Sequence, residues 1–595
     1  MPAPPNKLSR FWKDLKRRGV VQVITVYTSI ALVLIEIINN LIKYFDLPPI
    51  LGTFVIVILA VGFPLTLILS WLYDLSGDGI ERTKSIDELK EQGPVKVTNA
   101  WKIATYVSFA IILSLVTFNI LKGTSGLRSG DIKSLAILPF DNYTGDDGLD
   151  FVAAGMHSTL IGDMGKLGEL RVIGKTTSNA YRNTDISAPD IAKELNVEAL
   201  VEPTVTCYGD SVCIQIRVIT FFPEERQLWV GDFKEDKSQI LNLYNQITRQ
   251  IADEILVKLS PEEKRLFTES RAIDKEAYDE YLKGLSFLDD FSKEAMSKAM
   301  DNLNSAIEKE PDWAPLYAGL AKAWVVMAQI GYVSPSIAYQ NVNANLDKAL
   351  ELDPDLSEAH FIRGMSAYLH EWDWDKGEKE FSKALAINPN DGLSRIYYSH
   401  LLAILQRPEE ALAQGQLALD LDPLNPLLQC LYSALLVIVD DCEAALDQLD
   451  KIVAIDPENP LANNIIETAA FRCQDYQRTF KASKYILAFF FEEEVYNKIE
   501  GIYETKGFTA AYEEIAVQLE LYSETNPLLP TDLAMRNIYV HNLEKAMAWI
   551  EKGYESRDPN MPYIATGINN MDPLFDDPRF IAILEKMNLP LPKTN

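Results

Sequence analysis

The stretch Lys133 to Gly148, KSLAILPFDNYTGDDG, joins a short apolar run to a loop rich in aspartate and glycine. An apolar run that ends in Asn, Thr, Gly and Asp is typical of a β-strand entering a loop. Such a loop can cradle a phosphate when glycines let backbone N–H groups converge on the anion. This one has aspartates and no lysine, so its carboxylates would repel a phosphate unless a metal ion neutralised them. We therefore interpret the loop as a turn, with a metal site as the alternative.

The other residue types that commonly perform chemistry are scarce. The chain has five cysteines and five histidines, and no CxxC or HExxH spacing occurs. Nucleophile–base constellations are also missing from the sequence pattern. We therefore predict no catalytic residue, no cofactor and no metal site.

Charge divides the chain of 595 residues, which is long enough for several domains. Residues 1–130 hold 14 Lys and Arg against 9 Asp and Glu, whereas the remainder holds 42 against 76. An acidic surface argues against nucleic acid as a partner. Basic partners would explain the acidity, but we favour a solvated surface that keeps a large protein soluble.

Three apolar segments, 20–45, 51–73 and 101–121, each reach the length of roughly 20 residues that a helix needs to cross a bilayer. They predict a three-helix membrane region over 20–121, so that the lipid bilayer is an expected partner. Basic residues are concentrated in segment 1–19 and between the second and third segments. By the positive-inside rule, the N-terminus is then cytoplasmic and the chain after about Lys122 lies outside. We expect a bacterial inner-membrane protein with periplasmic soluble domains.

Strand-like and helix-like patterns alternate from 131 to 261, which predicts an α/β domain. SLAILPF and LRVIG are expected strands, and 150–165 and 240–259 are expected helices. EALVEPTVTCYGDSVCIQIRVIT is expected to form two strands around a turn at YGDS.

Residues 131–261 resemble the TolB-like amino-terminal domain, which is related to the FlgO-like domain. The resemblance depends on KSLAILPFDN, LRVIGKTTSNAY, DIAKELNVEALVEPTVT and QLWVGDF, and on Pro139, Phe140, Gly155, Leu160, Tyr181, Ala192, Leu195, Val197 and Trp229 in that order. The departures from the family pattern are Pro203, Cys207 and Cys213. The resemblance implies a non-catalytic domain that supports assembly or sensing and often precedes tetratricopeptide repeats in membrane proteins. Many relatives are labelled adenylate cyclases because a cyclase domain is sometimes fused to them.

Cys207 and Cys213 flank the expected hairpin turn. If the loop is Gly209–Ser211, Tyr208 pairs with Val212 and Cys207 faces Cys213. Directly opposed residues have Cβ atoms about 4.5–5.5 Å apart, slightly more than a disulfide prefers. The pair is either a disulfide, which an oxidising periplasm would favour, or two small apolar residues on one face of the sheet.

A repeat begins beyond Ala272. Prolines end helix-like runs at positions 311, 354, 389, 423 and 457, which are separated by 43, 35, 34 and 34 residues. A 34-residue period is the signature of tetratricopeptide repeats, each of which is a helix–turn–helix. A small residue lies five positions before most of these prolines: Ala306, Ala349, Ala384 and Ala418. We predict an all-α repeat solenoid over 274–458, with the extra residues of the long repeat near Tyr332–Ser336.

The chain from 459 to 595 continues as degenerate helical repeats. Segments 459–490, 493–525 and 532–557 each have the pattern of a helix pair. The stretch NMDPLFDDPRFIAILEKMNLP resembles the segment that caps the end of such arrays. We interpret Cys430, Cys442 and Cys473 as buried small apolar residues, with a Cys442–Cys473 bridge as the alternative.

First helices of repeats line a concave surface that typically binds a peptide or a partner's helix. Candidate residues of this partner-binding groove are Tyr317, His360, His370, Tyr397 and His400. The histidines could also form a metal site, but we interpret them as groove or packing residues.

The expected fold is thus multidomain: three transmembrane helices, an α/β TolB-like domain and an all-α tetratricopeptide-repeat solenoid. The expected function is a non-catalytic, membrane-anchored scaffold or sensor that binds a protein partner of unknown identity through the solenoid. The alternative is a signalling protein related to membrane-bound cyclases or transcription regulators that has kept only the sensory part. No unassigned segment is long enough for a cyclase domain, and too few residues precede the first apolar segment for a DNA-binding fold.

Overall fold

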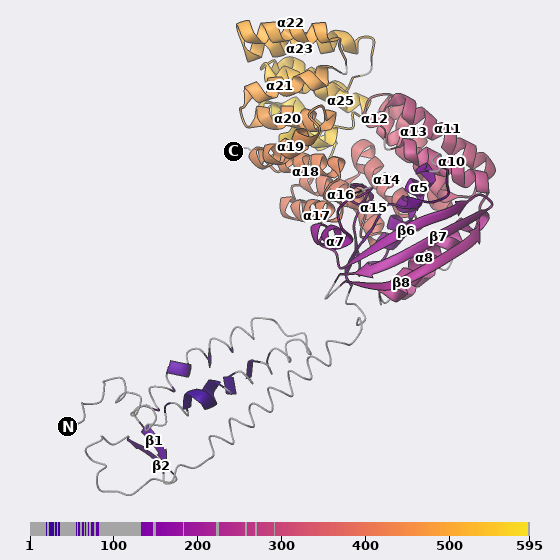
Figure 1. The fold of residues 1–595 in the computed structure, drawn as a ribbon. Coiled ribbons are helices and arrows are strands. Elements are labelled where there is room, and N and C mark those ends of the chain that lie inside the picture. The colour runs from indigo at the N-terminus through magenta and orange to yellow at the C-terminus, as the bar shows by residue number, and fades with distance from the viewer. Residues whose placement is uncertain are drawn as a thin grey trace. The chain divides into compact units, whose positions relative to one another are not determined.

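The computed structural model describes most residues from 132 to 592, with gaps at 147–149, 183, 222–224, 256–258, 268–270, 289, 291, 489 and 527, and scattered residues between 20 and 82. The chain divides into two compact units, residues 1–128 and 129–595 (Figure 1). In the first unit, β1 (Tyr73–Ser76) and β2 (Gly79–Arg82) form an antiparallel hairpin.

The expected membrane region requires a correction. Segment 101–121 and most of segments 20–45 and 51–73 lie outside the described residues. In the part of the chain that the structure describes, no helix has both the length and the apolar composition for a bilayer crossing. Three transmembrane helices, and a bilayer bound through them, are therefore not supported.

The second unit begins with a sheet of order β5–β3–β6–β7–β8, in which β4 also pairs with β6. Its strands are β3 (Ser134–Ile137), β4 (Asp141–Asn142), β5 (Arg171–Val172), β6 (Ala199–Tyr208), β7 (Ser211–Thr220) and β8 (Arg226–Asp236). The strand β3 runs parallel to β5 and β6, whereas β6, β7 and β8 form an antiparallel meander.

Helices cover both faces of this sheet. They are α5 (Asp150–Gly165), α6 (Lys175–Asn179), α7 (Ala188–Glu194), η2 (Lys237–Gln239), α8 (Ile240–Glu254) and α9 (Pro261–Leu266). In α8, Leu243, Ile247 and Ile251 recur at helical spacing and are buried, so this face packs beneath β7 and β8. On the opposite face, α7 packs against Ala136 and Leu200. The result is an α/β sandwich.

The rest of the unit is a helical array that curves away from the sheet (Figure 1). Its pairs are α10 (Lys275–Phe287) with α11 (Lys293–Lys309), α12 (Ala314–Gln329) with α13 (Pro335–Leu352), α14 (Ser357–Ser366) with α15 (Trp374–Ile387), α16 (Gly392–Ile404) with α17 (Pro408–Leu421), α18 (Pro426–Ile438) with α19 (Cys442–Ile455), α20 (Pro460–Arg472) with α21 (Tyr476–Leu487), α22 (Glu493–Lys506) with α23 (Phe508–Ser523), and α24 (Pro530–Tyr539) with α25 (Leu543–Ser556). A π-helical turn, η3 (Ala367–Glu371), extends α14. The array ends in η4 (Met561–Tyr563), η5 (Gly567–Asn569), η6 (Asp572–Leu574) and α26 (Pro578–Lys586).

The array has a tetratricopeptide-repeat-like fold, as the period predicts. The small residues expected between helices, Ala306, Ala349, Ala384 and Ala418, are all fully buried and permit close helix approach. The long repeat differs in detail from the expectation. Most of its extra residues lengthen the helices, because α12 and α13 have 16 and 18 residues whereas α16 and α17 have 13 and 14.

The turn between the two helices of a repeat holds a left-handed residue at a 34-residue spacing. Trp372, Gln406, Asp440 and Gln474 have φ angles of 60°, 59°, 73° and 62°. Glycine adopts this conformation without steric cost, whereas an L side chain costs roughly 1–2 kcal/mol there. The backbone of each turn is therefore strained by a residue that the sequence pattern does not identify as special.

We predict that Gln474→Gly raises the melting temperature, because its side chain is exposed and its backbone is left-handed. The expected gain is about 0.5–1 kcal/mol in unfolding free energy. Gln416→Gly is the matched control: this exposed residue lies inside α17, where glycine costs about 1 kcal/mol. The melting temperature, measured by circular dichroism, should therefore rise in Gln474→Gly and fall in Gln416→Gly. A melting temperature that falls equally in both variants would show that the turn is unstrained.

Candidate functional site: the inner surface of the helical array

The aspartate-rich loop is a turn in the part that is described. The Asn142 Oδ1 accepts hydrogen bonds from the Thr144 N–H at 3.1 Å and the Thr144 hydroxyl at 2.7 Å. Gly145 has a φ of 80°, which glycine tolerates. Residues 147–149 lie outside the described residues. The turn interpretation is confirmed for residues 141–146.

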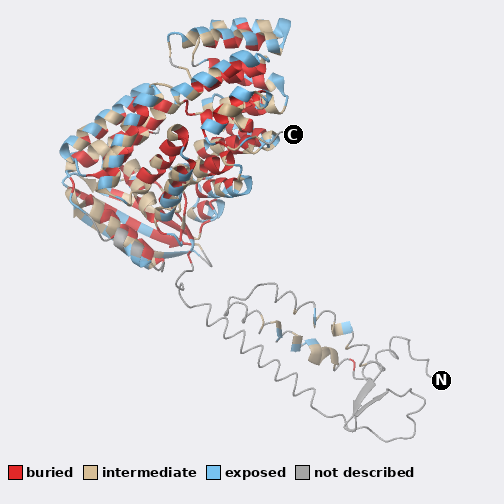
Figure 2. Ribbon diagram, turned by 180° about the vertical axis from the view of Figure 1, so that it is seen from behind, coloured by how far each residue is buried: buried red, intermediate tan, exposed pale blue. Residues whose placement is uncertain are grey.

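The five candidate groove residues all lie on or at the end of first helices, but none of them is exposed. His360 and His400 are buried, while Tyr317, His370 and Tyr397 are half-buried. The helices α12, α14, α16 and α24 contain no exposed residue at all. Exposed residues instead follow the second helices on the outside of the array, as Figure 2 shows in pale blue. These four first helices pack against the chain itself and do not border an open groove, whereas α10 and α22 have exposed residues.

A chain of buried hydrogen bonds holds His400. Its Nε2 lies 2.8 Å from the carbonyl oxygen of Leu431, so Nε2 carries the proton and donates. Its Nδ1 then accepts from the Tyr563 hydroxyl at 3.2 Å, and that oxygen accepts from Tyr368 at 3.1 Å. Burial lowers the pKa of His400 to about 4, which keeps the ring neutral. His400 therefore positions Tyr563 and is not available to a metal.

The other two histidines of the predicted groove also have internal contacts. His360 Nδ1 lies 2.5 Å from Glu380 Oε2, and its Nε2 lies 2.9 Å from the Pro354 carbonyl oxygen. The hydrogen bond from His360 lowers the pKa of Glu380. His370 stacks on Tyr339 with ring centroids 4.2 Å apart, and burial lowers its pKa to about 4. The three histidines do not converge on one point, and the described residues contain no His, Cys, Asp and Glu group that could hold a metal ion.

The C-terminal segment, residues 558–592, lies against the first helices. Trp374 donates from Nε1 to the carbonyl oxygens of Met587 and Asn588, each at 3.0 Å. Gln406 donates to the Leu591 carbonyl oxygen at 2.8 Å, and Arg472 forms an ion pair with Asp572 at 2.8 Å. Eight apolar side chains of this segment are almost fully buried: Met561, Ile564, Met571, Leu574, Phe580, Ile583, Leu584 and Met587. The expected cap thus covers the inner side of the array as well as α25.

A buried ion pair lies where α20, α23 and α24 meet. Arg536 donates to Glu467 Oε2 at 2.6 Å, and the Tyr512 hydroxyl donates to Glu467 Oε1 at 2.9 Å. The side chains of Arg536 and Glu467 are 3% and 1% exposed. The sequence pattern does not predict this pair, because the partners are 69 residues apart. The one local signal is the position of Glu467 within an apolar helix.

The α/β domain is attached to the array through turn residues between repeats. Asn390 donates to the carbonyl oxygens of Gly165 and Leu170 at 2.9 and 2.8 Å. Asp422 accepts from the Thr177 N–H at 2.7 Å, and the Gly174 N–H donates to the Leu421 carbonyl oxygen at 2.7 Å. These contacts satisfy main-chain groups on both sides, so the two parts form one body within residues 129–595.

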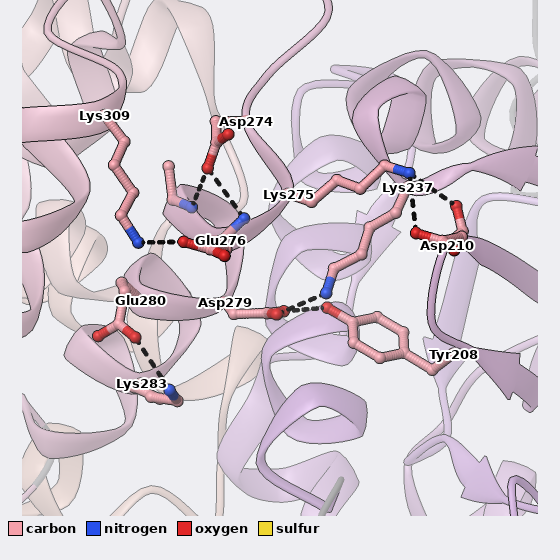
Figure 3. Close-up of polar contacts among 11 residues, drawn as sticks. Tyr208, Asp210, Lys237, Asp274, Lys275, Glu276, Asp279, Glu280, Lys283 and Lys309 are labelled. Carbon is pink, nitrogen blue, oxygen red and sulfur yellow. Dashed lines mark hydrogen bonds and ion pairs between the residues drawn. The ribbon is translucent and has the colours of Figure 1, made fainter.

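A second junction joins the sheet to α10, and Figure 3 shows its polar contacts. Asp279 accepts from the Tyr208 hydroxyl and from Lys237, each at 2.5 Å. The Lys237 ammonium also lies 4.2 Å from the centre of the Tyr208 ring. Burial raises the pKa of Tyr208, so the phenol stays protonated and donates. Lys237 is buried, and its charge is balanced by Asp279.

Four of the five cysteines form disulfides. Cys207 and Cys213 are directly opposed on β6 and β7 and are bridged across Cα atoms 4.8 Å apart. Cys442 and Cys473 are also bridged, which corrects their interpretation as unpaired apolar residues. The second bridge forms because Cys442 begins α19 and Cys473 directly follows α20. The repeat geometry brings their Cα atoms to 5.9 Å from each other. Cys430 is buried and free, as expected.

Comparisons with known proteins give a mixed result. No protein-family model matches the chain. A curated protein of Rhizobium meliloti (strain 1021) with the name "Putative adenylate cyclase 3" is 27% identical over 188 residues, which are 32% of each chain. The chain thus spans about a third of this relative. The name does not bear on the TolB-like resemblance, which stays a prediction.

Several solved repeat proteins are similar to part of the chain. Yeast Tom70 is 18% identical, with 52% of this chain and 68% of Tom70 covered and a TM-score of 0.32. PilF of Pseudomonas aeruginosa is 15% identical, with 41% and 98% covered and a TM-score of 0.28. The tetratricopeptide-repeat protein TTC0263 of Thermus thermophilus is 20% identical, with 34% and 95% covered and a TM-score of 0.24.

We predict that acid destabilises the second unit through its buried histidines. Burial lowers the pKa of His157, His370 and His400 to about 4 each. Between pH 6.5 and 4, the unfolded chain binds protons that the folded chain does not, so stability is lost as the pH falls. The expected loss approaches about 1.4 kcal/mol per pH unit for each histidine.

The measurement is urea unfolding at pH 7.0, 6.0 and 5.0. His400→Gln keeps a donor for the Leu431 carbonyl oxygen and should make the pH dependence shallower. His541→Gln, at an exposed histidine, is the control and should leave the slope unchanged. An unchanged slope in His400→Gln would show that His400 binds protons equally in the folded and unfolded chains, against the lowered pKa.

Proposed function

We propose that this chain is a non-catalytic protein-interaction scaffold whose array binds a partner protein on its outer surface. The observation that carries the proposal is the enclosure of the first helices, because it leaves the second helices as the accessible surface of the array. An array of repeats has an extended surface that suits protein partners. The name of the Rhizobium relative belongs to a protein of which the chain spans about a third, and we propose no cyclase activity.

The outer surface has a definite chemistry on α17 and α19. Exposed carboxylates follow these two helices: Glu409, Glu410, Asp420, Glu443, Asp447 and Asp450. Two large apolar side chains are exposed among them, Leu417 at 44% and Ile455 at 88%. Carboxylates attract basic side chains, and exposed leucine and isoleucine supply apolar contact area. The fitting partner is a protein segment that combines basic and apolar residues.

Site-specific photo-crosslinking in cells tests which side of the array binds the partner. We expect a benzoylphenylalanine at position 417 to give a discrete adduct. When an extract is irradiated instead of cells, the yield of this adduct should decrease as the salt concentration during irradiation rises. The same residue at position 397, which is half-buried on α16, is the matched control and should give none. An adduct from position 397 alone would place the partner in the inner groove and refute the outer surface. Absence of adducts at both positions would contradict the scaffold proposal.

We propose further that residues 129–595 function in an oxidising compartment, as expected for a periplasmic protein. The two disulfides support this proposal, because such bonds persist outside the reducing cytosol.

Thiol labelling after an acid quench of whole cells tests the compartment. With both disulfides formed, denatured protein should react with polyethylene-glycol maleimide only at Cys430 and shift by a single step on a gel. Prior reduction should produce five steps, one for each cysteine. Five steps without reduction would place the protein in a reducing compartment and exclude the proposal.

A further inference from the structure

The strand β8 is an uncovered edge of the sheet. It comes last in the order β5–β3–β6–β7–β8 and runs for 11 residues from Arg226 to Asp236. Within the described part of residues 129–595, no backbone hydrogen bond reaches its free side. A long edge strand of this kind is a template for another strand. In its middle, Asp232 and Lys234 carry opposite charges. A β-bulge interrupts the strand at Leu228, so Trp229 to Asp236 is the regular part available for pairing.

The alternation of hydrogen-bonded pairs between β7 and β8 shows which residues of β8 direct their backbone N–H and C=O groups away from β7. The Lys237 N–H donates to the Asp210 carbonyl oxygen, so Asp210 and Lys237 form a hydrogen-bonded pair of the β7–β8 hairpin. Because such pairs alternate in an antiparallel ladder, Trp229, Gly231, Phe233 and Glu235 also bond to β7. The residues between them present their N–H and C=O groups to the free side: Val230, Asp232 and Lys234.

An aromatic stripe lies along this edge on the face that α8 covers. Glu235 marks that face, because Gln246 of α8 donates to it at 3.4 Å. On the same face, the Trp229 and Phe233 rings are half-buried, with centroids 5.9 Å apart. Gly231 separates them, and a Cβ atom there would lie 2.0 Å from the Trp229 ring. Glycine therefore lets the tryptophan lie along its own strand.

The sequence of the strand, RQLWVGDFKED, is complementary to itself when read antiparallel about Gly231. Trp229 then faces Phe233 of the second copy, and the reverse pair forms across the two-fold axis. Aromatic pairs in directly opposed positions stabilise sheets. Val230 then faces Asp232, a pair without like charges, on the regular part of the strand. The β-bulge at Leu228 interrupts the pairing of residues 226–228.

Neighbouring registers of the same parity are poorer. A shift of the pairing centre toward the C-terminus places Asp232 opposite Asp232 of the second copy, and a shift toward the N-terminus brings the bulged residue Leu228 opposite Asp232. Directly opposed like charges destabilise a sheet. Both shifts also separate Trp229 from Phe233. The register centred on Gly231 is therefore the favoured one.

We propose that β8 is a self-association surface, through which two copies of this chain join their sheets by antiparallel β8–β8 pairing centred on Gly231. The symmetry is isologous, because each copy contributes the same strand. Two paired strands bury less surface than a standard interface, so the dimer is weak and concentration-dependent. This surface is separate from the outer surface of the array, and either proposal can fail alone.

Sedimentation equilibrium of the full chain in a mild detergent, from about 1 to 200 μM, tests the dimer. Val230→Pro removes an outward N–H and leaves the bonds to β7 intact, so this variant should stay monomeric. Val230→Glu and Val230→Lys form the matched pair at a 40% exposed site. Since residue 230 faces Asp232 of the second copy, Glu should weaken association about tenfold relative to Lys over two symmetric contacts.

Each outcome of these measurements either supports or overturns the proposed dimer. A monomeric wild-type chain at every concentration overturns the proposal and leaves the edge to some other occupant. A dimer that Val230→Pro does not weaken also overturns it, provided circular dichroism shows a folded variant. A reversed order, with Glu tighter than Lys, is expected for Val230 opposite Lys234 and overturns the register centred on Gly231. A monomeric Val230→Pro together with tighter association by Lys than by Glu supports the proposal.

Discussion

The enclosure of the first helices is the constraint on which the second unit depends. A polar group that is shut away from water must find an internal partner or cost roughly 1–3 kcal/mol. This requirement explains why Trp374 donates to the C-terminal main chain and why His400 bridges Leu431 and Tyr563. It also explains why Glu467 and Arg536 neutralise each other. The inner side of the array is a core with polar cross-links, and its histidines are part of that core.

The same constraint applies where the α/β domain meets the array. The turns between repeats would normally face water, but here Asn390 and Asp422 bond to main-chain groups of residues 165–177. Side-chain amides and carboxylates suit this task because they can match either a carbonyl or an N–H. The junction at Asp279 adds a buried charge pair at the other end of the sheet. The α/β domain and the array are therefore joined by polar contacts at two separate places.

Local sequence patterns predicted much of this fold, whereas contacts between residues far apart in the sequence were not predicted. The helix at Asp150–Gly165 and the pairing of Cys207 with Cys213 follow from periodicity and turn geometry, which act over a few residues. The 34-residue proline spacing predicted the helix pairs, because each repeat folds from its own sequence.

The three spans did not follow, since apolar composition alone does not establish a bilayer crossing. The contacts of Tyr563 with Tyr368 and His400 join residues 195 and 163 positions apart and have no local signal. The left-handed turn residues were missed because Trp372, Gln406 and Gln474 are not glycine.

The position of the C-terminal segment has a consequence for the way the protein is made. A simple solenoid contacts only its neighbours, so each repeat can complete its packing soon after leaving the ribosome. Here Trp374 and Gln406 bond to main-chain atoms at Met587, Asn588 and Leu591, which are synthesised much later than their partners. The inner helices of the early repeats must therefore wait with apolar surface uncovered while about two hundred further residues are translated. The closing step is delayed until residues 587–591 emerge, and during that interval the nascent chain exposes apolar surface that chaperones bind.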